Sequence, residues 1–190
     1  EAGRVTGVVL GDGRELSADL VVESVGSVCN TEWLMGNPEV DLTDGVLCDN
    51  HLEVVGAPGV VAVGDVTRFP NPLFDDIPRR VEHWSNATDT AKRAATTLAA
   101  RLRGGTPPAA PFVPVPSFWS DQLDLRFQSF GSPVLGDEAR LVEGDLGELA
   151  AGVLLTYHRD GRHVGTVGVN LPPARQRELR NAFSDLVPVG

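Results

Sequence analysis

Long apolar runs and closely spaced cysteines are both missing from this sequence of 190 residues. No apolar run reaches the roughly 20 residues that a membrane-spanning helix needs, and no basic-then-apolar start indicates a signal peptide. The chain begins at Glu1 without a methionine, so we expect the natural N-terminus to lie elsewhere. Cys29 and Cys48 fit neither a CxxC motif nor a metal-ligand spacing. We therefore expect reduced cysteines in a cytoplasmic protein that has no metal site and no membrane contact.

Two motifs of catalytic or cofactor-binding loops are absent as well. No GxGxxG loop occurs, and Gly11-Asp12-Gly13 is typical of a hairpin turn instead. No GxSxG nucleophile elbow occurs, which disfavours a hydrolase built on Ser85 or Ser120. The base of such a hydrolase would be His83 beside Asp121. The sequence therefore predicts no catalytic acid, base or nucleophile.

Basic residues are scarce outside one segment. The net charge of −10 argues against nucleic acid as a partner. Residues 66–103 nevertheless carry seven basic and four acidic groups, whereas residues 1–65 carry two and twelve. One interpretation is an ordinary solvated helix face. The other is a docking patch that meets a small acidic protein through complementary potentials.

Apolar patterning predicts strands in the first third of the chain. Val5–Leu10 and Glu15–Val22 flank the Asp-Gly turn and predict a hairpin. Ala18–Gly26 resembles a buried strand that ends at a glycine, and Thr31–Met35 permits a short helix. Gly59–Val63 is a continuous β-branched run, which predicts a buried central strand.

The middle of the chain predicts one loop, one helix and one linker. Pro70, Pro72 and Pro78 indicate a loop over residues 67–80. The Ala-rich periodicity of Ala87–Arg103 predicts a helix that is capped by Ser85 or Asn86 and stopped by Gly104-Gly105. Five prolines in residues 106–117 predict an extended connection between domains.

The last third predicts a small antiparallel sheet with a helix. Asp160-Gly161 is a turn between the final two of its strands, and Pro172 and Pro173 open a helix that continues to about Leu186. The predicted strands are Leu123–Phe130, Ala139–Glu143, Ala151–His158 and His163–Val169. The expected fold class is thus α/β in the first part and α+β in the second.

One candidate binding segment follows the β-branched run. The run delivers Gly64-Asp65 to its carboxyl end, where sheets of α/β proteins bind ligands. An aspartate there accepts hydrogen bonds from sugar-like hydroxyls, although on physics alone a simple turn aspartate explains it equally well. Arg79–Asn86 then leads into the helix, whose free N–H groups favour negative charge and whose Trp84 can line a flat ring.

In combination, these motifs resemble a known family. The stretch from Val60 to Ala87 resembles the second FAD-binding segment of ferredoxin, putidaredoxin and rubredoxin reductases, within the pyridine nucleotide-disulfide oxidoreductase superfamily. The matching residues are Ala62-Val63-Gly64-Asp65-Val66, Asn71-Pro72, Arg80-Val81-Glu82, Trp84-Ser85-Asn86-Ala87 and Phe118-Trp119-Ser120-Asp121-Gln122. The last of these resembles the opening of the family's C-terminal domain.

The resemblance implies roles for particular residues. Gly64 and Asp65 hold the ribityl chain of FAD, and the Val66 backbone meets the flavin. Glu82, His83 and Trp84 line the flavin from the helix start, and Trp119 lies near the face that is open to the electron acceptor. Gly26 approaches the nicotinamide of NAD(P)H, although Cys29 replaces the proline that the family usually has nearby.

The resemblance also implies three parts and a function. Residues 1–35 end an NAD-binding domain, 36–114 form the second, Rossmann-like segment of an FAD-binding domain, and 115–190 form the C-terminal reductase domain. The implied activity passes electrons from NAD(P)H through FAD to a ferredoxin-like iron–sulfur protein, with both GxGxxG segments lying before residue 1. This chain alone is then expected to bind FAD poorly and to be inactive.

Several points stay open at this stage. The alternative function is a flavin-free interaction or dimerisation module that keeps the fold, and a homodimer is compatible with both functions. NADH cannot be distinguished from NADPH, because the residues that read the ribose are absent. Four arginines form the predicted docking patch, and reversing two of them is expected to slow ferredoxin reduction. These are Arg68, Arg79, Arg80 and Arg93.

Overall fold

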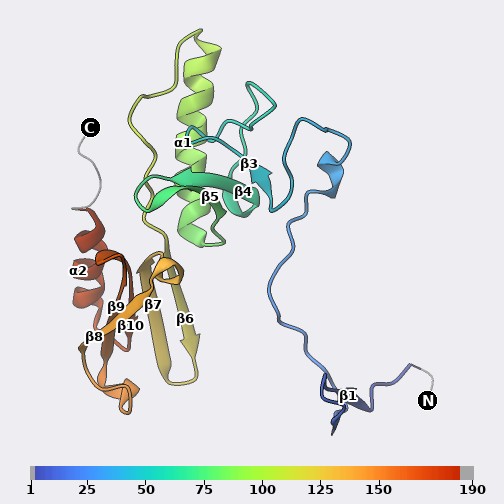
Figure 1. Ribbon diagram of the computed structural model, residues 1–190, viewed down its shortest axis with the longest axis vertical. Helices are drawn as coiled ribbons and strands as arrows, with labels where there is room; N and C mark the ends of the chain where they lie inside the picture. The colour runs from blue at the N-terminus through green and yellow to red at the C-terminus, as the bar shows by residue number, and fades with distance from the viewer. Residues whose placement is uncertain (1–2, 185–190) are drawn as a thin grey trace.

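The computed structural model describes residues 3–184 and divides them into an N-terminal extended segment, a middle lobe and a C-terminal lobe (Figure 1). The elements of the first two parts are β1 (Gly7–Val9), β2 (Glu15–Ser17), β3 (Val46–Leu47), β4 (Thr67–Asn71), β5 (Asp75–Arg80) and α1 (Trp84–Leu102). Those of the C-terminal lobe are β6 (Ser117–Gln122), β7 (Leu125–Gly131), β8 (Glu138–Glu143), β9 (Val153–Arg159), β10 (Arg162–Val169) and α2 (Pro173–Ser184).

The C-terminal lobe is an antiparallel sheet of strand order β6-β7-β10-β9-β8, with α2 packed beside β7. Asp160 (φ 51°) and Gly161 (φ 74°) both have positive φ, as the tight turn between β9 and β10 requires. Phe183 of α2 is completely buried. The predicted sheet-plus-helix arrangement is confirmed, although the sequence prediction missed β6, and the end of the expected helix lies outside the described residues.

The middle lobe packs α1 with a small sheet of order β3-β4-β5. Its core includes Leu52, Phe69 and Ala94. The loop predicted for residues 67–80 is wrong, because this stretch forms the β4–β5 hairpin. Pro70 lies where the pairing register of the two strands shifts, and Pro78 lies on the edge strand β5. Both are positions at which a strand tolerates the missing N–H donor.

The buried central strand predicted for Gly59–Val63 is also wrong. Val61 forms only an isolated bridge with Glu53. Val60 and Val63 are exposed. A β-branched run becomes a central strand only when strands on both sides satisfy its backbone groups, and among the described residues only the short bridged segment around Glu53 lies beside it.

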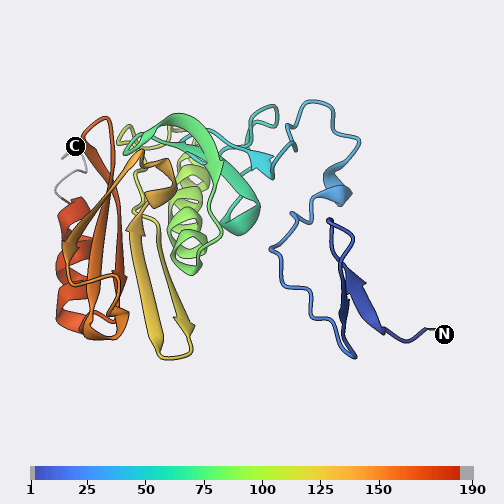
Figure 2. The same cartoon turned by 60° about the horizontal axis from the view of Figure 1, so that its bottom comes forward.

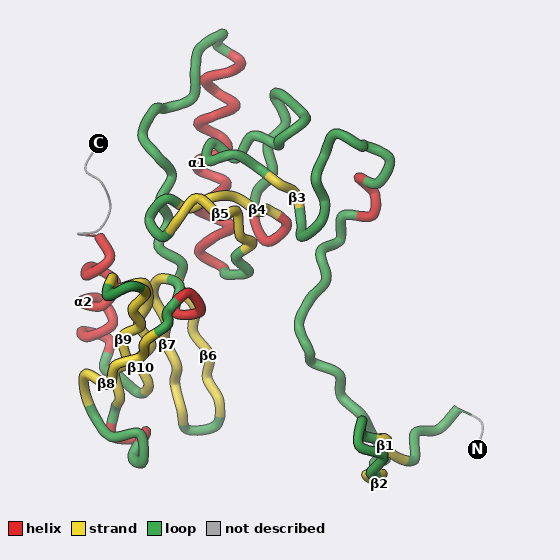
Figure 3. Tube along the Cα trace, viewed as in Figure 1, coloured by secondary structure: helices red, strands yellow, loops and turns green. Residues whose placement is uncertain are grey.

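The N-terminal segment extends away from the rest of the molecule in both ribbon views (Figures 1 and 2). β1 and β2 form the predicted hairpin, with Val8 opposite Leu16. The buried strand predicted for Ala18–Gly26 is wrong, because residues 19–28 are exposed and irregular, as the loop colour in Figure 3 shows. The predicted short helix is present as a 3-10 turn over Glu32–Leu34.

The helix α1 starts earlier than predicted and ends close to the predicted position. It begins three residues before the predicted start, with His83 rather than Ser85 or Asn86 at the N-cap and no side-chain cap. Its end is as predicted, because the Gly104 N–H donates to the Arg101 carbonyl with a positive φ at the glycine.

The connection from α1 to β6 is extended, as predicted, and it is tied to the middle lobe. The side-chain amide of Asn50 donates to the Phe112 carbonyl at 2.9 Å and its oxygen accepts from the Phe112 N–H at 2.7 Å. Asn71 donates to the Pro114 carbonyl at 2.8 Å. The connection therefore runs along the surface of the lobe.

The predicted fold class, a mixed α/β part followed by a small α+β part, is confirmed. The division into domains at residues 35 and 114 stays a prediction. None of the helices within residues 3–184 is both long enough and apolar enough to cross a membrane. Within the same residues no group of three metal-ligating side chains comes together.

Candidate functional site

The Gly64-Asp65-Val66 turn is held against the first turns of α1. The Gly64 N–H donates to the hydroxyl of Thr90 at 2.9 Å, and this hydroxyl donates in turn to the Asn86 carbonyl at 2.6 Å. Thr90 is fully buried. Gly64 has φ 76°, a conformation that side chains other than glycine rarely adopt. The turn is therefore fixed in place and presents Asp65 at the surface.

Asp65 lies beside a network of charged groups. Arg80 donates to the Asp65 backbone carbonyl at 3.4 Å and pairs with the carboxylates of Asp44 and Glu82. Glu82 also accepts a 2.6 Å hydrogen bond from Ser27. The hydrogen bonds from Ser27 and Arg80 hold the pKa of Glu82 below its usual value. The Asp65 carboxylate itself is exposed and available to a ligand.

The start of α1 presents one half-buried and one exposed aromatic ring. His83 lies against Phe118, with the ring centroids 5.4 Å apart, and burial lowers the pKa of the imidazole. Trp84, the first residue of the helix, is 84% exposed. Large aromatic side chains bury much apolar area on binding, so an exposed tryptophan at a helix start marks a place where a flat ring can stack.

A cavity of about 480 Å³ joins the helix start to β6. We call it the tryptophan cavity. Trp119 on β6 contributes a second exposed ring, 59% accessible, to the same cavity. Its lining is Glu82, His83, Trp84, Ser117, Phe118 and Trp119. The structure thus brings together four of the eight predicted cofactor residues from two stretches separated by the whole of α1.

The other four predicted cofactor residues lie around this cavity or further away. Gly64, Asp65 and Val66 pack against the first turns of α1 and do not line the cavity. Gly26 lies on the N-terminal segment with φ 107° and open space around it, one residue before Ser27 and its bond to Glu82. The roles predicted for all eight residues stay predictions.

The four arginines of the predicted docking patch all engage neighbouring groups. Arg68 lies 2.8 Å from Asp41, whose pKa is lowered to about 2, mainly by hydrogen bonds from Thr43. Arg79 donates to both oxygens of Asp75. Arg93 lies 2.7 Å from a ring nitrogen of His51, on a different part of the lobe. Arg68, Arg79 and Arg80 are therefore paired with carboxylates, whereas the contacts of Arg93 are with His51 and the Pro108 carbonyl. The docking role of all four arginines stays a prediction.

The residues considered for a hydrolase are used differently. The Ser85 hydroxyl accepts a 3.3 Å hydrogen bond from Ser117, and Asp121 pairs with Arg126 at 3.2 Å. His83 Nδ1 is buried without a hydrogen-bond partner among the described residues. No nucleophile, base and acid are aligned by these contacts.

Sequence reasoning missed three residues that organise the site. Ser27 orients Glu82, Thr90 fixes the Gly64 turn, and Phe118 closes the cavity over His83. Phe118 stood in the motif that begins the predicted C-terminal domain, so its neighbourhood was visible. No sequence motif marks Ser27 or Thr90, because each acts through one contact between segments that are far apart in the sequence.

Comparisons with known proteins identify relatives of this chain. Residues 1–91 match the family described as pyridine nucleotide-disulphide oxidoreductase. A probable ferredoxin reductase, CtmF, of Castellaniella defragrans is 36% identical over 171 residues, which are 90% of this chain and 39% of the relative. The peroxisomal monodehydroascorbate reductase 1 of Oryza sativa subsp. japonica is 35% identical over 169 residues, 86% of this chain and 34% of that relative.

A solved structure extends the comparison to the fold. The covalent complex of putidaredoxin reductase with putidaredoxin contains a similar chain, with a TM-score of 0.74 and 28% identity. The match covers 96% of this chain and 40% of the other. This chain therefore spans about two fifths of the length of the ferredoxin reductase relatives that it matches.

Proposed function

The chain belongs to the pyridine nucleotide-disulphide oxidoreductases, in their ferredoxin reductase branch, and we propose that it forms part of a flavoprotein that passes electrons from NAD(P)H to a ferredoxin-like iron–sulfur protein. Members of this family bind FAD and NAD(P)H. The observation that carries the proposal is the tryptophan cavity, whose lining residue Glu82 is linked through Arg80 to the backbone of the Asp65 turn. Since the relatives are more than twice as long, the remaining cofactor contacts come from sequence outside residues 1–190.

The residues around the tryptophan cavity fit a flavin. An isoalloxazine is flat and mainly apolar, and Trp84 and Trp119 offer exposed rings of matching chemistry. His83 Nδ1 is a buried polar atom with no partner in the described part of the chain, as expected of a group that faces a polar ring edge. The N-cap of α1 has no side-chain hydrogen bond, so no capping side chain competes with an anionic edge for the N–H groups of Trp84 and Ser85.

Each side chain then has a defined task. The Asp65 carboxylate accepts hydrogen bonds from the hydroxyls of the ribityl chain. The N-terminus of α1 stabilises negative charge next to the ring. Trp84 and Trp119 cover the ring and exclude water from it. When bound, FAD supplies hydride acceptance from NAD(P)H and the stepwise release of electrons.

The names of the relatives suggest two classes of electron acceptor, an iron–sulfur protein and a small organic radical. The names of two relatives specify ferredoxin or putidaredoxin, and the rice relative is named for monodehydroascorbate. We favour the iron–sulfur protein because the ferredoxin reductase matches 90% of this chain at 36% identity. Steady-state reduction of each acceptor by the full-length protein separates the classes, and a preference for the ascorbate radical would contradict our choice.

The first prediction concerns Asp65. In the full-length protein, Asp65→Ala should weaken FAD binding about ten- to hundredfold, because hydrogen bonds to a charged group contribute about 1.5–3 kcal/mol. The measurement is flavin absorbance of the purified protein, followed by FAD titration of the apoprotein. Asp76→Asn is the matched control, because this exposed aspartate of β5 lines no part of the tryptophan cavity.

Three outcomes decide the proposal. Wild-type protein with bound flavin and a flavin-poor Asp65 variant support it. Equal flavin content in Asp65→Ala and in the control Asp76→Asn contradicts the role of Asp65. A full-length protein that binds no FAD defeats the reductase assignment and leaves the flavin-free interaction module as the better description.

A further inference from the structure

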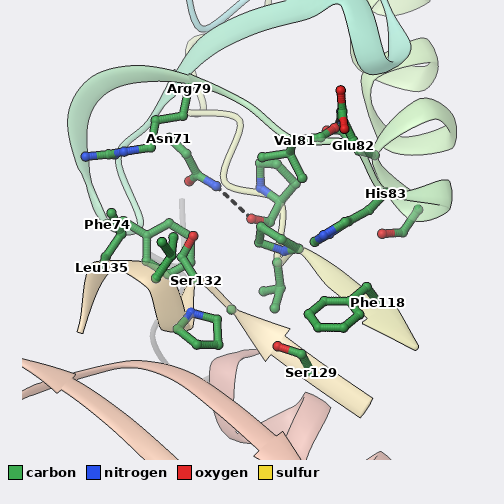
Figure 4. A pocket seen from close by; sticks show the side chains of 18 of the residues that line it. Asn71, Phe74, Arg79, Val81, Glu82, His83, Phe118, Ser129, Ser132 and Leu135 are labelled. Carbon is green, nitrogen blue, oxygen red and sulfur yellow. Dashed lines mark hydrogen bonds between the residues drawn. The ribbon is translucent and has the colours of Figure 1, made fainter. Parts of the chain in front are cut away.

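A second cavity, of about 350 Å³, lies between the β4–β5 hairpin and the C-terminal sheet (Figure 4). We call it the hairpin cavity. Its floor is one face of the sheet, where Ser129 of β7 stands opposite Phe118 of β6 and Val167 of β10. Phe69 and Phe74 of the hairpin line the other side. The volume falls within the range of about 300–1,000 Å³ that is typical of small-molecule sites.

The walls of the hairpin cavity are fixed by contacts that cross between the lobes. Arg162 donates to the Leu73 carbonyl at 2.7 Å, and Arg159 donates to the Phe74 carbonyl and pairs with Asp75, both at 2.8 Å. The hydrogen bond from Asn71 to Pro114, drawn dashed in Figure 4, holds the connection along one side. These contacts prevent the hairpin from closing onto the sheet.

A glycine borders the cavity at the end of β7. Gly131 has φ 76°, and a Cβ atom there would lie 2.5 Å from the Val164 carbonyl oxygen and 2.7 Å from the ring of Phe183. A larger residue would therefore disturb the packing of α2 beside β7, which confines this position to glycine.

One buried hydroxyl without a partner lies in the mainly apolar wall of this cavity. Ser129 is 1% exposed, and its hydroxyl has no hydrogen-bond partner among the described residues. Ser129 lines the hairpin cavity on the face of the sheet. A buried polar group without a partner is destabilising, and a hydrogen bond to a ligand offsets that loss.

Charge selects against an ionic ligand. Arg79, Arg80, Glu82 and Asp89 line the cavity, and the first three are paired: Arg79 with Asp75, and Arg80 with Asp44 and Glu82. Burial lowers the pKa of His83, which favours the neutral imidazole at neutral pH. Burying an unpaired charge among Phe69, Phe74 and Phe118 would be strongly unfavourable, whereas a neutral ring loses little on entering.

We propose that the hairpin cavity is a binding site for a small, neutral, mainly apolar molecule with one hydroxyl group, of the size of a monocyclic phenol. The hydroxyl bonds to Ser129, and the ring contacts Phe69, Phe74 and Val167. His83 also lines the tryptophan cavity, so an occupant of the hairpin cavity contacts a wall that both cavities share. The site does not depend on the proposed reductase function.

The test compares two probes of nearly equal shape, p-cresol and toluene, by isothermal titration calorimetry with the full-length protein. Wild-type protein should bind p-cresol more tightly than toluene. Ser129→Ala should weaken p-cresol binding about three- to tenfold, as expected for one hydrogen bond, and leave toluene binding unchanged. Ser120→Ala is the matched control, because this serine on β6 lines neither cavity.

A second variant tests the location of the site. Val167→Phe fills the floor of the hairpin cavity and should abolish binding of both probes, with the thermal unfolding midpoint confirming that the protein remains folded. Equal affinity for the two probes, an unaltered p-cresol affinity in Ser129→Ala, or no binding of either probe overturns the proposal. Flavin absorbance of the same samples is independent of these outcomes, so failure here is distinct from failure of the reductase assignment.

Discussion

The C-terminal lobe and the N-terminal segment are both rich in β-branched residues, yet only one of them forms a core. In the C-terminal lobe Val153, Val164 and Val169 are at most 3% exposed. In the N-terminal segment Val25 and Val28 are 84% and 91% exposed. The difference lies in pairing, since tight antiparallel connections give each valine of the lobe a neighbouring strand.

This contrast shows what an apolar run can and cannot determine. A hairpin carries its own partner, so β9 and β10 follow directly from the Asp160-Gly161 turn. Ala18–Gly26 has the same composition but no strand beside it among the described residues. A contiguous exposed apolar stretch of this kind is typical of a surface that packs against another segment of polypeptide.

The largest expected loss of stability comes from truncating a side chain in the core of the C-terminal lobe. Phe183→Ala should lower the free energy of unfolding by about 3–5 kcal/mol, because the ring is completely buried and leaves a cavity. Val25→Ala, its counterpart in the exposed segment, should change the same quantity by less than about 0.5 kcal/mol. Urea denaturation of both variants measures the difference. Similar losses in the two would mean that the segment is packed in solution.

An intermediate effect is expected where the middle lobe joins the C-terminal lobe. Asp75 pairs with Arg79 and Arg159, and Asp75→Asn should cost about 1–3 kcal/mol because it leaves partly buried guanidinium groups without their carboxylate. Asp12→Asn is the control, since its pair with Arg14 is exposed and contributes little.

The effect of Asp75 should depend on pH in a defined direction. The hydrogen bonds from Arg79 hold the pKa of Asp75 far below the value of about 3.9 of an unfolded chain. The stabilisation is therefore fully present above that value and is lost as the pH falls toward the lowered pKa. Thermal midpoints of wild-type protein and Asp75→Asn should converge below about pH 4. A difference that stays constant across this window would exclude the ion pairs as its source.

The smallest effect tests how the N-terminal segment is attached. The exposed hydrogen bond from Ser27 to Glu82 should contribute less than about 0.5 kcal/mol to unfolding, so Ser27→Ala leaves the thermal midpoint unchanged. Proteolytic cleavage within residues 19–28 should nevertheless become faster. Ser24→Ala, on the same exposed stretch, is the matched control, and equal cleavage rates in the two variants would show that the bond does not restrain the segment.

Local patterns predicted the parts of the fold that depend on local pairing. The helix end at Gly104, the β9–β10 turn and the C-terminal sheet were visible in the sequence, because each is determined by residues close together. The β4–β5 hairpin was missed, since Pro70 and Pro78 are tolerated there only through a register shift and an edge position. Burial of Gly59–Val63 was predicted wrongly because composition does not say whether a partner strand is present.

The candidate site divides in the same way. Gly64, Asp65 and Trp84 stand in one continuous motif, and their proximity follows from the sequence. The approach of Trp119 and Phe118 to the helix start depends on the path of the connection between the lobes, which no local pattern determines. The hairpin cavity had no sequence signal at all, because its polar atoms come from β7 and from the start of α1.

The connection between the lobes has a consequence for length variation. Asn50 and Asn71 hold the backbone at Phe112 and Pro114, so residues between these points and β6 are kept in register. An insertion there would displace Phe118 relative to His83. An insertion between Gly104 and Thr106, which are exposed, would only enlarge a surface loop, at a small entropic cost. Engineered linkers, affinity tags or reporter domains therefore belong at the start of this connection, before Pro108, whose carbonyl is held by Arg93.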